Sequence, residues 1–121
     1  MESFSIKKRL KSFEYAFKGL SHAISTQHNI WIHLLATALI IWAGFHYCLN
    51  GTEWCIILLS IGLVLGLEII NSSIESLTDM VSPEYDKLAG KVKDMAAGAV
   101  LLAAIVTAVI GFIVFLPKIM A

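Results

Sequence analysis

The sequence predicts an all-α membrane protein, with an amphipathic N-terminal helix on the membrane surface followed by three transmembrane helices, in a single domain of residues 1–121. Hydrophobic residues make up 58% of the chain and charged residues only 15%, a more apolar composition than that of ordinary soluble domains. Apolar stretches alternate with short polar ones, and the net charge is zero. We therefore expect a membrane protein without a nucleic-acid partner.

The first expected element, residues 1–29, is the surface helix. Its apolar residues recur at spacings of three and four, which places them on one side of a helix: Leu10, Phe13, Phe17, Leu20 and Ile24. Charged residues occupy the rest of the circumference, as in helices that lie in the membrane interface. A core helix of a soluble domain is the alternative, and the apolar segments that follow argue against it.

Three apolar stretches follow, and we expect them to form membrane helices at residues 30–49, 54–81 and 95–116. The apolar part of the second, residues 54–67, would cover only about 21 Å at about 1.5 Å per residue. The hydrocarbon core of a bilayer is about 30 Å thick. The second helix must therefore continue into the polar stretch that begins at Glu68.

Short polar segments separate these helices. Residues 50–53 read as a turn without a basic residue, and residues 82–94 as a cytoplasmic loop or short helix. Ser82 and Pro83 suit the N-cap and first position of that short helix. Pro117 follows the last membrane helix.

Basic residues indicate the orientation in the membrane. They precede the first membrane helix or lie in residues 82–94, and no Lys or Arg occurs from His22 to Asp86. Because basic loops stay inside, the N-terminus and residues 82–94 are expected in the cytoplasm and the C-terminus outside. Lys118 is the one exception.

The two cysteines, Cys48 and Cys55, are too few and too widely spaced for a redox or zinc motif. Free cysteines usually pack as small hydrophobic residues. We therefore expect both to be buried and assign them no function.

Four polar side chains extend the second membrane helix as a stripe: Glu68, Asn71, Glu75 and Asp79. At about 100° per residue they share an arc of about 80°. A charge inside a membrane helix costs a few kcal/mol, so such groups usually face a cavity or another helix and act there. The alternative, a polar helix end that has emerged into the cytoplasm, fits Asp79 best and Glu68 least.

Lys93 and Asp94 stand where the last membrane helix begins. Lys93 alone would be a positively charged anchor at the membrane surface. Opposite carboxylates that hold a divalent cation, it can also neutralise phosphate oxygens, and phosphoryl transfer needs chiefly these groups and a base near the attacking hydroxyl. No glycine-rich nucleotide-binding loop is present. The residues alone therefore indicate an intramembrane acidic site with a nearby lysine.

The segment EIINSSIESLTDMVSPEYDKLAGKVKDMAAGAV, Glu68 to Val100, resembles the signature of the prokaryotic diacylglycerol kinase family. It contains the pattern E-x-x-N-[ST]-[AS]-I-E-x-x-x-D, then a K-D pair and a small-residue helix, and SFEYAFKGL and HNIWIHLL fit as well. The resemblance implies a homotrimeric kinase of the bacterial cell (inner) membrane, with active sites shared between subunits at the cytoplasmic face. It would use ATP and Mg²⁺ to phosphorylate the hydroxyl of a membrane lipid, diacylglycerol or undecaprenol.

The resemblance also implies roles for individual residues. Glu68 would be the general base or would orient the hydroxyl, and Asn71 would support the site. Glu75 would ligate magnesium, while Lys93 and Asp94 would contact the ATP phosphates and metal, with Asp79 nearby. A last group would approach the nucleotide: Tyr15, Glu84, Tyr85 and Asp86. For the two tyrosines an interfacial anchor is an equal alternative.

Gln27 departs from the family pattern, which has a metal-binding Glu at this position. A carboxamide oxygen can ligate magnesium but carries no charge, so the metal should be held less tightly. Either His28 or a neighbouring subunit compensates, or the enzyme is slow. Trp31 stands where many relatives have Arg. His33 is interpreted as a polar residue packed near the interface, with a ligand role as the alternative.

Two other functions stay open at this point. One is a small ion-coupled transporter or channel subunit in which Glu68 binds protons or cations. The other is a weakly active or silent relative of the kinases, which Gln27 favours. The exposed group formed by Lys93, Asp94 and Glu84 favours the kinase, because a transporter does not require it. The lipid acceptor is not determined, because the apolar grooves that select it have no sequence motif.

Overall fold

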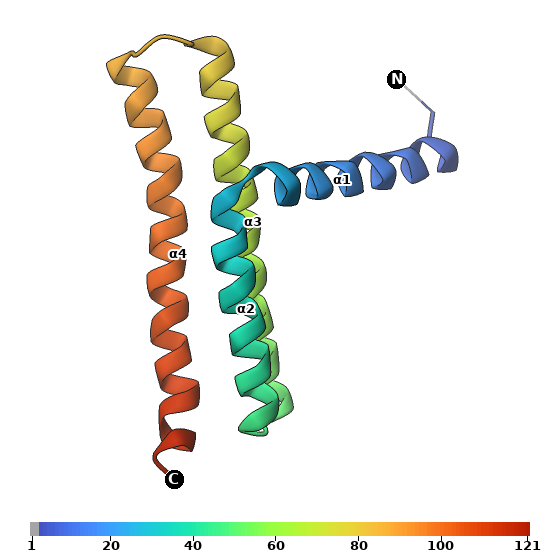
Figure 1. Ribbon diagram of the computed structural model, residues 1–121. Helices are drawn as coiled ribbons and strands as arrows, with labels where there is room; N and C mark the ends of the chain where they lie inside the picture. The colour runs from blue at the N-terminus through green and yellow to red at the C-terminus, as the bar shows by residue number, and fades with distance from the viewer. Residues whose placement is uncertain (1–2) are drawn as a thin grey trace.

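The computed structural model describes residues 3–121, which form four helices and no strand. The helices are α1, Ile6–Thr26, α2, His28–His46, α3, Gly51–Val81, and α4, Lys87–Ile119. Figure 1 shows α2, α3 and α4 side by side as a column, while α1 leaves the column crosswise. The α2–α3 turn and the C-terminus lie at one end, and the α3–α4 loop lies at the other. The predicted all-α architecture is confirmed.

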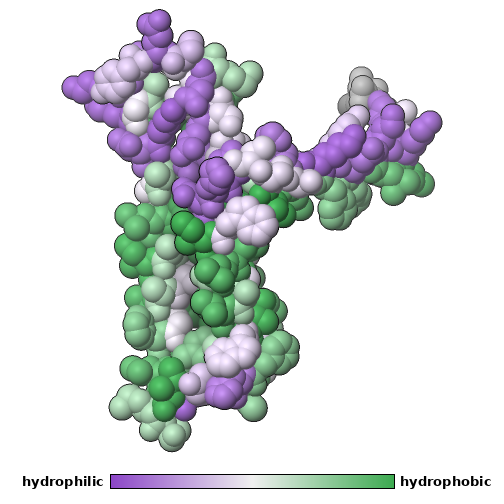
Figure 2. Space-filling model, in the orientation of Figure 1, coloured by the Kyte–Doolittle hydropathy of each residue, from purple (hydrophilic) through white to green (hydrophobic). Residues whose placement is uncertain are grey.

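The three helices of the column are long and apolar enough to cross a membrane, by length and composition. Large apolar side chains are exposed along all of them, for example Leu35, Leu59 and Leu101. Figure 2 shows this hydrophobic surface along the column, with hydrophilic residues gathered around the α3–α4 loop. A surface of this kind is stable when lipid or another chain covers it.

The amphipathic character of α1 is visible in Figure 2, where hydrophilic residues follow one side of the helix and hydrophobic residues the other. An elbow at Gln27 joins α1 to the column. There the backbone is extended, and the Gln27 N–H donates to the carbonyl of Ala23 at 3.0 Å. The indole N–H of Trp31 donates to the carbonyl of Ile24 at 2.9 Å, which ties the start of α2 to the end of α1.

The turn between α2 and α3 is a Schellman motif. The N–H of Leu49 donates to the carbonyl of Gly44 at 3.1 Å, and that of Cys48 to Phe45 at 3.3 Å. Cys48 has φ 54°, a left-handed conformation that usually selects glycine. The expectation of buried cysteines was wrong, because both Cys48 and Cys55 are exposed in this chain.

Helix α3 begins at Gly51, earlier than expected, because Asn50 and Glu53 form a capping box. The Asn50 side chain accepts from the Glu53 N–H at 2.9 Å, and the Glu53 carboxylate accepts from the Asn50 N–H at 3.1 Å. Glu53 also pairs with Lys118 of α4 at 3.1 Å. Lys118, the one basic residue that did not fit the expected orientation in the membrane, therefore has an ion-pair partner in Glu53.

The α3–α4 loop is shorter than expected. Ser82 is the C-cap of α3, its N–H donating to the carbonyl of Thr78 at 2.8 Å, so its expected role as an N-cap was wrong. Asp86 is the N-cap of α4, because its carboxylate accepts from the Leu88 N–H at 2.7 Å. Residues 87–94, expected in the loop, are the first two turns of α4. At its other end this helix runs past Pro117 to Ile119.

Candidate functional site

The polar stripe lies on the half of α3 that ends at the α3–α4 loop. Glu68 is only 4% exposed and Asn71 is buried, while Glu75 is half-buried and Asp79 exposed. Exposure therefore rises along the stripe from the middle of the column towards the loop. This is the depth order that the sequence predicted for a site that reaches from the apolar interior to water.

Asn71 and Glu75 form the centre of the stripe. The Asn71 amide donates to a Glu75 carboxylate oxygen at 3.3 Å. The carbonyl oxygen of the Asn71 side chain is buried without a hydrogen-bond partner. An unsatisfied buried acceptor costs about 1–3 kcal/mol, so this oxygen indicates a partner outside the single chain.

The oxygen atoms of Asn71 and Glu75 fit magnesium, which prefers oxygen ligands and keeps several of its waters. Residues 3–121 hold no group of three or more His, Cys, Asp or Glu side chains placed to bind a metal. Within these residues, Asn71 and Glu75 therefore offer oxygen atoms but not a complete set of metal ligands.

Lys93 reaches the stripe from α4. Its ammonium donates to the Asp79 carboxylate at 2.5 Å, and the charge of Glu75 also acts on it. Packing of α3 against α4 thus brings a lysine to the two outer carboxylates. This is the juxtaposition on which the prediction of a phosphate site depended.

Other predicted residues lie around this pair. Asp94 is exposed, and its carboxylate has no ion-pair partner within the described chain. Glu84 and Tyr85 are exposed in the loop, Tyr85 at 93%. Asp86 is exposed too, and its carboxylate already caps α4.

Tyr15 lies apart from these residues. It is exposed on α1, with the Lys18 ammonium 5.8 Å from the centroid of its ring. Figure 1 shows α1 running away from the α3–α4 loop, and within residues 3–121 no hydrogen bond links Tyr15 to residues 84–86. A single chain therefore does not join the two parts of the expected nucleotide site.

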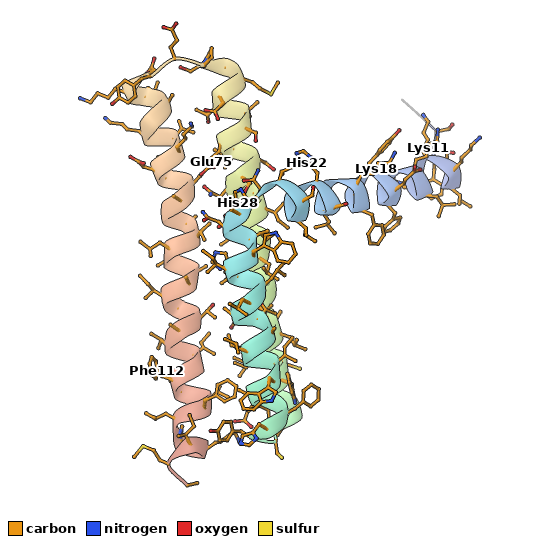
Figure 3. All side chains as sticks on the ribbon, viewed as in Figure 1. Lys11, Lys18, His22, His28, Glu75 and Phe112 are labelled. Atoms are coloured by element: carbon orange, nitrogen blue, oxygen red, sulfur yellow. The ribbon has the colours of Figure 1, made fainter. Side chains whose placement is uncertain are left out.

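Gln27 lies at the elbow, half-buried, and lines a groove of about 470 Å³ between α1 and α3. Polar residues of both helices border this groove, among them His22 of α1 and Ser72, Ser73 and Ser76 of α3. In Figure 3, His28 and Glu75 lie at a similar level near the elbow, while Lys18 and Lys11 lie progressively farther along α1. Gln27 therefore lies where the end of α1 meets the serine-lined side of α3.

The structure also reveals a contact that sequence reasoning missed. His33 of α2 lies against Glu68, with 3.5 Å between its Nε2 atom and a carboxylate oxygen. The available signal was that a deeply buried carboxylate needs a partner, and His33 is one of very few polar side chains in the apolar stretch of α2.

Comparisons with known proteins bear on this arrangement. Residues 14–115 match the family model described as prokaryotic diacylglycerol kinase. The chain is 36% identical over 113 residues to the undecaprenol kinase of Bacillus subtilis, covering 93% of this chain and 92% of that protein. It is 39% identical over 113 residues to the diacylglycerol kinase of Synechocystis, covering 93% of this chain and 65% of that protein. It is 34% identical over 105 residues to the diacylglycerol kinase of Escherichia coli K12, covering 83% and 82%.

Proposed function

The chain belongs to the prokaryotic diacylglycerol kinase family and is a lipid kinase, and from this premise we propose that it transfers the γ-phosphate of ATP to the hydroxyl of diacylglycerol or undecaprenol. The observation that carries the proposal is Lys93 of α4 held at the acidic stripe of α3. A cation beside carboxylates, at the level where apolar surface gives way to water, suits a reaction between a lipid alcohol and a soluble nucleotide.

Glu68 is the proposed general base. Its carboxylate accepts the proton of the lipid hydroxyl while the hydroxyl oxygen forms a bond to the γ-phosphorus. The bond from that phosphorus to the β–γ bridging oxygen breaks, and ADP leaves. The low exposure of Glu68 supports this role, because an acyl or isoprenoid chain keeps its alcohol near the apolar part of the column.

Lys93 and Asp94 are the proposed contacts of the phosphates. The Lys93 ammonium donates to phosphate oxygens, either in place of its ion pair with Asp79 or in addition to it. Glu75 and Gln27, with the unpaired oxygen of Asn71, would hold Mg²⁺. When bound, the ion neutralises the charge of the phosphate oxygens.

A homotrimer would complete the site. The nucleotide would lie between Glu84, Tyr85 and Asp86 of one subunit and Tyr15 of the next, since one chain keeps these groups apart. The exposed apolar faces of the column support such an assembly. We place the protein in the bacterial cell membrane, with its N-terminus and active site at the cytoplasmic face, because α1 carries basic residues and Lys87, Lys91 and Lys93 follow the α3–α4 loop in the first turns of α4.

The test is a kinase assay of the purified protein in lipid, with Mg-ATP and either diacylglycerol or undecaprenol. We expect phosphorylation of at least one acceptor and an approximately 100-fold or greater loss with Glu68→Gln, because general-base catalysis contributes about 10²–10⁴-fold. Glu53→Gln is the matched control, because Glu53 lies at the opposite end of α3.

Two results would count against the proposal. Turnover that survives Glu68→Gln would remove the assigned base. Proton flux across vesicles without ATP, together with no lipid phosphorylation, would favour the ion-coupled transporter instead.

A further inference from the structure

We propose that His33 is a positioning residue that orients the buried Glu68 carboxylate, and so makes it competent as a base; the inference rests on the proposed lipid kinase function. The two side chains meet across α2 and α3 with 3.5 Å between His33 Nε2 and Glu68 Oε2. At this distance the contact is an ion pair when the imidazole is protonated.

The burial of Glu68 makes a partner necessary. A carboxylate that is 4% exposed in an apolar bundle loses most of its hydration, and it stays charged only beside a positive or hydrogen-bonding group. Across residues 3–121, His33 is the only side chain at ion-pair distance from Glu68. The nearest basic residue along the stripe, Lys93, is held by Asp79 on the side of the α3–α4 loop.

The surroundings of His33 increase the effect of this contact. His33 lines a groove of about 250 Å³ between α2, α3 and α4, whose other walls include Ile40, Ile61 and Val64. Few polar groups are present there to compete for the carboxylate, so its polar interaction with the imidazole is stronger than in water. His33 is also fixed on a continuous helix rather than on a loop, which restricts its position.

Two properties of the imidazole are separable by substitution. Its N–H can donate to the carboxylate, and its ring fills space between α2 and α3. His33→Leu removes the donor at similar volume. His33→Gln keeps a donor of similar reach. If His33 only packs against its neighbours, the two variants should behave alike.

The experiment compares these variants in lipid with wild type and with His46→Leu and His46→Gln. His46 ends the same helix and stacks on Trp42, far from Glu68, so it provides matched controls. We expect His33→Leu to lower kcat at least about tenfold with little change in the KM for ATP, and His33→Gln to recover part of that loss. The His46 variants should keep the kcat of the wild type.

A second measurement does not depend on turnover. A hydrophobic carbodiimide modifies neutral carboxyl groups in membranes, and mass spectrometry can follow its addition to Glu68. We expect faster labelling of Glu68 in His33→Leu than in wild type or the His46 variants. If the protein phosphorylates no lipid, the proposed function fails while this labelling still tests the contact.

Specific results would overturn the inference. Labelling of Glu68 at the wild-type rate in His33→Leu would show that His33 does not hold that carboxyl group. Equal losses of kcat in His33→Leu and His33→Gln would reduce His33 to a packing residue. Thermal unfolding of each variant in detergent separates these outcomes from loss of the fold.

Discussion

At Asn71, one end of a buried amide is satisfied and the other is not. Its nitrogen donates to Glu75, and its oxygen has no partner within the described residues. The oxygen points to a cation or a neighbouring chain, because a buried acceptor without a partner is unfavourable. Residues such as Asn71, whose polar atoms lack a hydrogen-bond partner within one chain, are therefore the most informative ones of this site.

Gln27 allows a direct test of the proposed metal site. Gln27→Glu adds a negative charge to an oxygen ligand, so we expect the Mg²⁺ concentration for half-maximal activity to fall, by roughly threefold or more. Titration of turnover with Mg²⁺, and of binding with Mn²⁺ by electron paramagnetic resonance, would measure the change.

Thr26→Glu is the matched control, because it places the same charge one residue earlier on an exposed side chain. An unchanged Mg²⁺ dependence in Gln27→Glu would show that this position does not limit metal binding. An equal gain in Thr26→Glu would show a general effect of charge.

At the scale of the elements, the helix ends are the best-defined features of the fold. The capping box at Asn50 and the N-cap at Asp86 start α3 and α4, while the Schellman motif ends α2. These local bonds determine where each helix begins and stops, and hence at which level the stripe of α3 meets Lys93 of α4.

Cys48 supports a prediction about stability. A residue other than glycine is destabilised by about 1–2 kcal/mol in the left-handed region. Glycine removes this strain but makes the unfolded chain more flexible, so Cys48→Gly should raise the free energy of unfolding by only about 0.5–1 kcal/mol. Cys55→Gly makes the same change inside α3 and should lower it by roughly a few tenths of a kcal/mol. Reversible denaturation in mixed micelles measures both, and a destabilised Cys48→Gly would contradict the assigned conformation.

At the scale of the whole molecule, the chain is a column of α2, α3 and α4 from which α1 extends crosswise. The column exposes apolar side chains on several sides, and α1 carries Tyr15 away from the loop that it is expected to approach. Both features are explained if neighbouring copies of the chain pack against the column and contact α1. The assembly is thus part of the proposed active site.

We expect the purified protein to be a trimer, measurable by native mass spectrometry from detergent or nanodiscs. The apolar faces of the column provide the driving force for association, through close packing of helices in the membrane. Cross-linking between a cysteine introduced at Tyr15 and one introduced at Tyr85 should yield products larger than one chain. A monomer with full kinase activity would contradict the shared site.

The sequence by itself determined the number and type of the helices, the polar stripe and its depth order. These depend on hydrophobicity and on the periodicity within one helix, which neighbouring residues control. It also identified the family, through the pattern from Glu68 to Val100. It placed some helix ends wrongly: Ser82 ends α3 while Asp86 caps α4, and α4 continues past Pro117 to Ile119.

Only the tertiary structure decided which side chains meet across helices. His33 lies against Glu68, Lys93 against Asp79, and Lys118 against Glu53. Each pair joins residues distant in the chain, so its geometry depends on how the helices rotate and shift against one another. Helical periodicity assigns a residue to a face, whereas packing determines what that face touches.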